Sequence, residues 1–185
     1  MRIFLCGSIS VRELPSEVSQ LVLGLSADKH EFLLGDAPGA DLAFQKLLFQ
    51  NGVESVQVFH SGTSLRNNVG RWKTRFVDSG LKGGHAMHAA KDRVMASESD
   101  IGIMVWDGFS IGTITNAATM LRDGKSCYFY ESNKMRLSEF GELSELSPLE
   151  SEYVAEFAEM RKRIAKYDKR DRRLRDEKSA DDLLF

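Results

Sequence analysis

Residues 107–113 (DGFSIGT) form a turn rich in glycine and hydroxyl side chains, which are residue types that can hold a phosphate group. The apolar run at 101–106 predicts a strand before this turn, and residues 116–122 predict a helix after it. At a helix start the unpaired backbone N–H groups converge, the helix dipole favours negative charge, and glycine lets the backbone approach an oxyanion closely. We therefore expect an anion site here. Its expected lining residues are Gly108, Ser110, Gly112 and Thr113.

A second turn, residues 35–41 (GDAPGAD), is the most specific string in the chain. Gly35 and Gly39 allow a tight backbone path, and Asp41 is placed to cap the following helix by accepting its free N–H groups. That arrangement leaves Asp36 without a capping role. Its carboxylate could bind ribose hydroxyls, take part in acid–base chemistry, or make an Asx-type bond to the local backbone.

A third glycine turn, Gly7-Ser8, follows the first expected strand. All three turns would lie at the carboxyl ends of parallel strands, which is the edge where open α/β sheets bind their ligands. Three such turns on one edge favour a nucleotide or phosphosugar ligand. The alternative is that they are ordinary connections between strands and helices.

Short apolar runs alternate with helical patterns through residue 130, and this alternation predicts parallel strands joined by right-handed crossovers. We expect an α/β fold, a Rossmann-like three-layer sandwich with a mainly parallel sheet of about five strands. The expected strands are residues 2–6, 31–34, 55–59, 101–106 and 126–130, and the expected helices are residues 14–25, 41–50, 85–97 and 116–122. Residues 61–84 are expected to form a long loop, of the kind that is usually a lid or a disordered segment.

The pattern changes after residue 130, so we expect a nucleotide-binding domain over residues 1–130 and a linker with a charged C-terminal helix over residues 131–185. The helix is amphipathic. Its apolar stripe contains Tyr153, Val154, Phe157, Met160, Ile164 and Tyr167. The stripe could pack on the same domain, or, if exposed, it would favour a homo-oligomer or a docked partner. The basic run at 161–175 is interspersed with acids, which is typical of a solvated face rather than of a nucleic-acid contact.

The composition narrows the function classes. The net charge of −2 over 185 residues makes nucleic-acid binding across the whole surface unexpected. Cys6 and Cys127 both lie in expected strands, which indicates reduced, core-filling thiols and no zinc site. No signal peptide or membrane span is recognisable. We expect a cytoplasmic protein with no metal, no cofactor and no membrane partner.

Three further side chains could do chemistry. His85 and His88 are spaced so that they share a helix face and could chelate a metal, contact a ligand phosphate, or simply lie on the surface. No acidic third ligand occurs at a matching spacing, so a metal site is not expected. Trp106 ends the strand before the 107–113 turn and could stack on a base or be a half-buried sheet residue.

Three motifs in order resemble the SLOG superfamily: the turn at 35–41, the string Lys91-Asp92-Arg93-Val94-Met95, and Ser99-Asp100 followed by a strand and residues 108–113. This superfamily includes the DprA DNA-processing proteins, the LOG phosphoribohydrolases and small bacterial nucleotide-binding proteins. The resemblance covers residues 1–130 and is strongest to the small nucleotide-binding branch. It implies a Rossmann-like domain that binds a nucleotide or nucleotide-derived ligand at the strand ends.

The sequence departs from the LOG enzymes at two positions. Their glutamate, which assists cleavage of an N-glycosidic bond, is matched by Asn116, and an amide cannot replace an anion in that step. Their arginine is matched by Lys91, with Arg93 two residues further on. A second resemblance, to nucleoside 2-deoxyribosyltransferases, lacks the same carboxylate at Asn116.

We therefore expect a protein that binds a nucleoside phosphate, NAD or an ADP-ribose type of molecule. The expected pocket residues are Gly7, Ser8, Asp36, Gly39, Lys91, Arg93, Gly108, Ser110, Gly112, Thr113 and Asn116. The alternative is an N-glycosidic hydrolase or transferase in which Asp36 or Asp107 replaces the missing glutamate.

Overall fold

The computed structural model describes the backbone of residues 1–80 and 84–182, and the side chains of these ranges except those of His85 and of residues 171–182. A seven-stranded sheet forms its centre, in the order β4-β3-β2-β1-β5-β6-β7. The strands are β1 (Arg2–Gly7), β2 (Glu31–Gly35), β3 (Val56–His60), β4 (Lys73–Phe76), β5 (Ile101–Trp106), β6 (Ser126–Glu131) and β7 (Arg136–Phe140). Neighbouring strands pair in parallel except β7, which runs antiparallel to β6.

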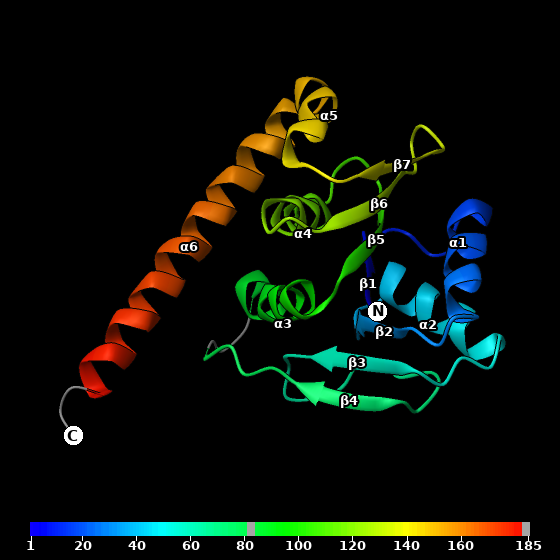
Figure 1. Ribbon diagram of the computed structural model, residues 1–185, viewed down its shortest axis with the longest axis horizontal. Helices are drawn as coiled ribbons and strands as arrows, with labels where there is room; N and C mark the ends of the chain where they lie inside the picture. Colours follow the sequence, from blue (N-terminus) through cyan, green and yellow to red (C-terminus); the bar gives the residue numbers. More distant parts are fainter. Residues whose placement is uncertain (81–83, 183–185) are drawn as a thin grey trace.

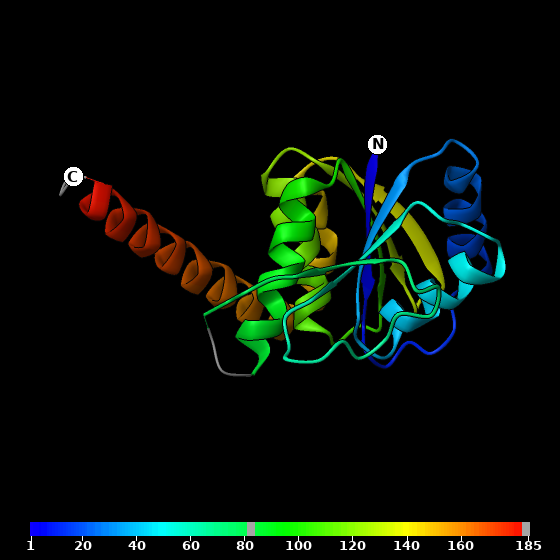
Figure 2. The same ribbon diagram turned by 90° about the horizontal axis from the view of Figure 1, so that it is seen from below.

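Helices cover both faces of the sheet, which makes the three-layer sandwich visible in Figures 1 and 2. The helices are α1 (Ser16–Ser26), α2 (Ala40–Gln50), α3 (His85–Glu98), α4 (Ile111–Arg122), α5 (Ser147–Glu152) and α6 (Val154–Asp182), with a short 3-10 turn at Leu143–Leu146. Helices α1 and α2 lie on one face, and α3, α4 and the start of α6 lie on the other. The predicted α/β class is confirmed.

The core consists of two apolar layers, one on each face of the sheet. Alternate residues of a strand point to opposite faces, so Ile3 and Leu5 of β1 belong to the layer under α1 and α2. Phe4 and Cys6 belong to the layer under α3, α4 and α6. Both thiols are buried, as the sequence predicts.

The sheet has two more strands than the five expected. Strand β4 lies inside the segment 61–84 that was expected to be a loop, and its four residues, KTRF, are all exposed at the sheet edge. Strand β7 lies beyond residue 130 and has the sequence RLSEF. Neither strand has the apolar alternation of a buried strand, because each is an edge strand. In β7 only Leu137 and Phe140 pack against the core.

Helix α6 packs its apolar stripe on its own domain. Phe157 and Met160 are 2% and 5% exposed, and Ile164 packs against the same apolar layer. At these residues the helix packs on the same domain, whereas Val154 of the stripe is 66% exposed. The homo-oligomer stays a prediction. The later part of α6 extends beyond the body of the molecule (Figure 2). Within the described ranges, none of the helices has the length and apolarity needed to span a bilayer.

Candidate functional site

A pocket of about 450 Å³ lies at the carboxyl edge of the sheet, between α3 and α4 and beside the first part of α6. We call it the α3–α4 pocket. Six of the residues expected from the sequence line it: Gly7, Arg93, Asp107, Ser110, Gly112 and Asn116. Helix α6 contributes Arg163 and Tyr167, and α3 contributes His88 and Asp92. The pocket volume is in the range that holds a small-molecule ligand.

The carboxylate of Asp107 organises the turn after β5. Its Oδ1 accepts hydrogen bonds from the backbone N–H groups of Phe109 (2.9 Å) and Ser110 (2.8 Å) and from the Ser8 hydroxyl (2.9 Å). Its Oδ2 accepts one from the Ser10 hydroxyl at 2.6 Å. Partial burial acts to raise the pKa of Asp107, but these donors outweigh it and hold the pKa below its usual value. Asp107 is therefore an ionised acceptor that fixes the turn.

The start of α4 keeps free backbone donors that face the pocket. The helix begins at Ile111, five residues before the expected start, because Ser110 acts as its N-cap and accepts from the Thr113 N–H at 3.4 Å. Among the residues that the structure describes, the N–H groups of Ile111 and Gly112 have no hydrogen-bond partner. Both residues line the pocket, while the Thr113 side chain is buried beneath it and Gly108 lies outside it.

The turn after β2 has a different surrounding. Asp36 is 1% exposed and pairs with Arg66, whose Nη2 is 2.5 Å from Oδ1 and whose Nε is 3.0 Å from Oδ2. Burial acts to raise the pKa of Asp36, but the hydrogen bonds and charge of Arg66 lower it below its usual value. Asp36 does not line the α3–α4 pocket. Arg66 is 30 residues away in the sequence, and no local pattern indicates the pairing.

Asp41 also has a role that differs from the expectation. Helix α2 starts after Gly39 without a side-chain cap, so the expected cap by Asp41 is wrong. The Asp41 carboxylate instead accepts from the Ala37 N–H at 3.2 Å and lies 3.6 Å from the Lys91 ammonium. Burial raises the pKa of Asp41 to about 6, although the positive charge of Lys91 opposes this. The carboxylate binds to its own turn and to α3 because its side chain faces the interior.

Lys91 completes a group of charges beneath the turn after β2. The residue is 4% exposed, and its ammonium nitrogen lies 2.8 Å from Asp92 Oδ1. Burial acts to lower the pKa of Lys91, but Asp92 and Asp41 raise it above its usual value, so the lysine stays charged. We call Asp36, Asp41, Arg66, Lys91 and Asp92 the charge cluster. Lys91 is part of this cluster and does not line the pocket.

Gly39 is required for contact between two turns. Its φ is +81°, and a Cβ atom there would lie 2.3 Å from the Ile9 carbonyl oxygen. Ser8 follows β1 and is fully buried, with its hydroxyl bonded to Asp107. Gly39 and Ser8 therefore contact the turns that border the pocket and do not line the pocket themselves.

Arg93 lines the pocket from α3, and none of the acidic side chains that the structure describes forms an ion pair with it. Its Nη1 is buried without a hydrogen-bond partner among these residues, and its guanidinium lies over the Tyr167 ring at 4.5 Å from the ring centre. Such stacking is a favourable cation–π contact and leaves the edge of the guanidinium available for hydrogen bonds. The stripe pattern of α6 placed Tyr167 on the packing face, but no sequence signal placed it, or Arg163, at the pocket.

The remaining candidates are distributed between pocket and core. Asn116 lines the pocket, and its amide donates to the Cys6 sulfur at 3.5 Å. Trp106 is fully buried and donates from Nε1 to the Ser110 carbonyl at 3.0 Å, so its ring supports the turn and does not face a ligand. His88 lines the pocket, and burial lowers its pKa. The His85 side chain lies outside the described residues, and within those residues no cluster of metal-binding side chains is found.

Comparison with solved structures finds a similar fold in DNA processing protein A from Helicobacter pylori, whose structure was described for its single-stranded DNA binding mode. The two chains are 16% identical, with a TM-score of 0.54, and the match covers 83% of this chain and 73% of that one. No family model and no curated protein matches the sequence. The similarity therefore establishes the Rossmann-like α/β fold of this chain.

Proposed function

We propose that the protein binds a nucleotide or nucleotide-derived molecule in the α3–α4 pocket, with a phosphate group at the start of α4. The observation that carries the proposal is that Ile111 and Gly112 line this pocket and that their N–H groups have no hydrogen-bond partner among the described residues. Helix starts bind phosphate because such donors converge there and the helix dipole favours an anion. Arg93 and Arg163 add positive charge to the same cavity.

The rest of the pocket suits the nucleoside part of such a ligand. Asn116 offers an amide donor and acceptor, and Asp92 offers a carboxylate acceptor for hydroxyl groups. The apolar part of the pocket wall includes Ala89, Ala96 and Ile111. A few polar groups set among apolar walls are typical of a site that fixes the orientation of a small molecule.

The alternative is cleavage or transfer at an N-glycosidic bond, and the contacts of the two candidate carboxylates disfavour it. Asp36 is neutralised by Arg66 and lies outside the pocket wall. Asp107 lines the pocket but accepts four hydrogen bonds. A carboxylate that is held by several donors is a weaker nucleophile and a weaker base, since those bonds stabilise its charge.

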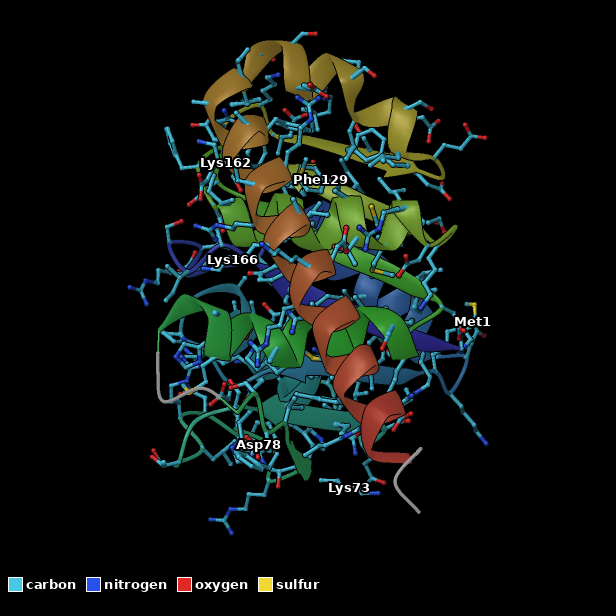
Figure 3. All side chains as sticks on the ribbon, turned by 90° about the vertical axis from the view of Figure 1, so that its left-hand side faces the viewer. Met1, Lys73, Asp78, Phe129, Lys162 and Lys166 are labelled. Carbon is cyan, nitrogen blue, oxygen red and sulfur yellow. The ribbon has the colours of Figure 1, made fainter. Side chains whose placement is uncertain are left out.

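A second candidate function is single-stranded nucleic-acid binding, which the structural similarity to DNA processing protein A favours. Lys162 and Lys166 lie on one side of α6, one helical turn apart, near the pocket (Figure 3). They could hold a phosphate backbone. This candidate predicts that the affinity for a fluorescent oligonucleotide falls steeply between 50 and 200 mM salt, by about 10-fold or more if several phosphates are contacted.

The main proposal is tested with AMP, NAD and ADP-ribose, and with adenosine as the matched ligand that lacks phosphate. We expect AMP, NAD or ADP-ribose to raise the melting temperature and to bind at least about tenfold more tightly than adenosine, because a charge-assisted phosphate contact contributes more than about 1.4 kcal/mol. Chromatography of the same mixtures should detect no free base. Absence of binding by all of them would overturn the proposal. Release of base that stops in Asp107→Asn would instead establish the enzymatic alternative.

A further inference from the structure

The α3–α4 pocket has hydrogen-bond donors at two separate places. One is the start of α4, where the N–H groups of Ile111 and Gly112 are free among the described residues. The other is Arg93, which also lines a neighbouring pocket together with Thr119. Arg93 and Thr119 line both pockets, so Arg93 lies where the two pockets adjoin, beside the later part of α4.

The two places are separated along helix α4. The pocket wall includes α4 residues from Gly112 to Thr119, both of which line the pocket. Seven residues of α-helix rise by about 10 Å, which is longer than a single phosphate group. Two phosphates on opposite sides of a ribose, together with the length of the Arg93 side chain, cover this span.

Arg93 has the properties of a ligand-binding cation. Arg93 lines the pocket, and its buried Nη1 has no hydrogen-bond partner among the described residues, so no described acceptor neutralises this part of the guanidinium. The nearest acidic side chain of α3, Asp92, is already held by Lys91 at 2.8 Å. The Tyr167 ring stacks on the guanidinium and fixes its plane. Arg163 reaches the same cavity from α6.

We infer that the α3–α4 pocket contains two anion subsites, one at the start of α4 and one at Arg93 beside α6, and that its ligand carries phosphate groups at two separate positions of a nucleoside. This rests on the proposed function, since it assigns the ligand class of the same pocket. A nucleoside 3′,5′-bisphosphate has this arrangement. A nucleoside diphosphate has the same number of phosphates, but they form one chain at one end.

The test compares these isomers on the full chain by calorimetry, with adenine and with cytosine as the base. Adenosine 3′,5′-bisphosphate or its cytidine counterpart should bind about tenfold or more tightly than ADP or CDP, because only the bisphosphate reaches both subsites. AMP and CMP report on the first subsite alone. The isomers have equal composition, but the bisphosphate carries about one more negative charge at pH 7. The comparison is therefore repeated in about 0.5 M salt, which screens a general attraction to charge.

Arg93→Gln should remove most of that preference, because it weakens binding of the bisphosphate by a larger factor than binding of AMP. Arg93→Lys keeps the charge without the guanidinium fork and should retain part of the preference. Lys46→Gln, which removes an exposed charge on α2, should leave all affinities unchanged. A structural role of Arg93 alone would change the melting temperature without changing the ratio between the isomers.

Equal affinity of the wild-type protein for both isomers, together with clear binding of AMP or CMP, would overturn this inference and leave the proposed function standing. Absence of binding by every nucleotide would overturn both. The isomer comparison on the wild-type chain decides the question even if the Arg93 variants fail to fold.

Discussion

The turn after β2 (residues 35–41) and the turn after β5 (residues 107–113) both follow a buried parallel strand, and each contains two glycines and at least one aspartate. In the first turn, Asp36 and Asp41 are buried and pair with Arg66 and Lys91. In the second, Asp107 binds only hydroxyl and backbone donors, and the turn borders the α3–α4 pocket. The same residue types therefore build an internal ion-pair network in one turn and a pocket edge in the other.

The difference comes from what packs against each turn. Arg66 and Lys91 reach the first turn from the 61–72 segment and from α3, and they fill the space where a ligand would lie. No basic side chain among the described residues pairs with Asp107, so the start of α4 keeps its donors for the pocket. A turn that contains glycine and aspartate at the end of a strand thus predicts an anion site only under one condition. The turn must not already be filled by an ion pair between its carboxylate and a basic side chain of the same chain.

The largest expected effect on stability is at Lys91. Lys91→Met leaves Asp41 buried without its counter-charge, and removing one partner of a buried ion pair lowers the free energy of unfolding by about 3 to 5 kcal/mol. Urea denaturation at pH 7 measures this. Lys46→Met, at an exposed lysine on α2, is the control and should change stability by less than about 0.5 kcal/mol. A loss below about 1 kcal/mol at Lys91 would mean that the charge cluster does not stabilise this turn.

Gly39→Ala should have the next largest effect. The left-handed backbone at φ +81° and the contact with the Ile9 carbonyl are both incompatible with a Cβ atom. Backbone strain of about 1–2 kcal/mol and overpacking of about 1–3 kcal/mol together lower the free energy of unfolding by about 2 to 5 kcal/mol. Gly24→Ala is the matched control, because a Cβ at this helical position meets nothing within 4 Å. It should stabilise slightly.

Asp41 gives the first turn an unusual dependence on pH. Burial raises the pKa of Asp41 from 3.8 to about 6, so the folded protein binds this proton at a higher pH than the unfolded chain does. The stability contributed by Asp41 is therefore highest below about pH 4 and falls as the pH rises to about 6, by up to about 3 kcal/mol at 1.36 kcal/mol per pKa unit.

The variant Asp41→Asn lacks this titration. The difference in unfolding free energy between Asp41→Asn and the wild-type protein should thus grow in favour of the variant between pH 4 and pH 6. Asp36, whose pKa is lowered, acts in the opposite direction but equally in both proteins. A difference that stays constant, or that falls over this range, would mean that the charge of Lys91 outweighs the burial of Asp41.

These contacts also mark what the sequence could predict. The apolar runs of β1, β2, β3, β5 and β6 follow from their periodicity because these strands are buried between two helical layers. The edge strands β4, which is exposed, and β7, which is partly buried, could not be recognised, since pairing with a neighbouring strand defines them more than burial does. For the site, the turn at 107–113 follows from local chemistry. Two other features of the site depend on contacts between residues far apart in the chain. They are the pairing of Asp36 with Arg66 and the position of Tyr167 at the pocket, stacked on Arg93.

Ser110→Ala tests the second turn with a smaller effect on stability. The Ser110 hydroxyl accepts the Thr113 N–H and the Thr113 hydroxyl, so its loss removes the cap of α4. N-cap replacements by alanine lower the free energy of unfolding by about 1 kcal/mol. Ser16→Ala is the control, because the Ser16 hydroxyl bonds only to the exposed Glu17 side chain. If both variants have the same stability, the cap contributes nothing to the fold.

Gly112→Ala should have the smallest effect on stability and the clearest effect on binding. The nearest atom that a Cβ would meet is the Ser110 hydroxyl at 3.9 Å, so the fold accommodates it, and alanine favours the helix by up to about 1 kcal/mol. The methyl group would nevertheless stand where a phosphate approaches the free N–H of residue 112. Affinity for AMP should fall by about tenfold or more while the free energy of unfolding is kept or slightly raised. The expected change in stability is the reverse of that in Gly39→Ala, where stability is lost because Gly39 allows two turns to pack in close contact. Full affinity in Gly112→Ala, with unchanged stability, would move the phosphate away from α4 and remove the distinction between the two turns.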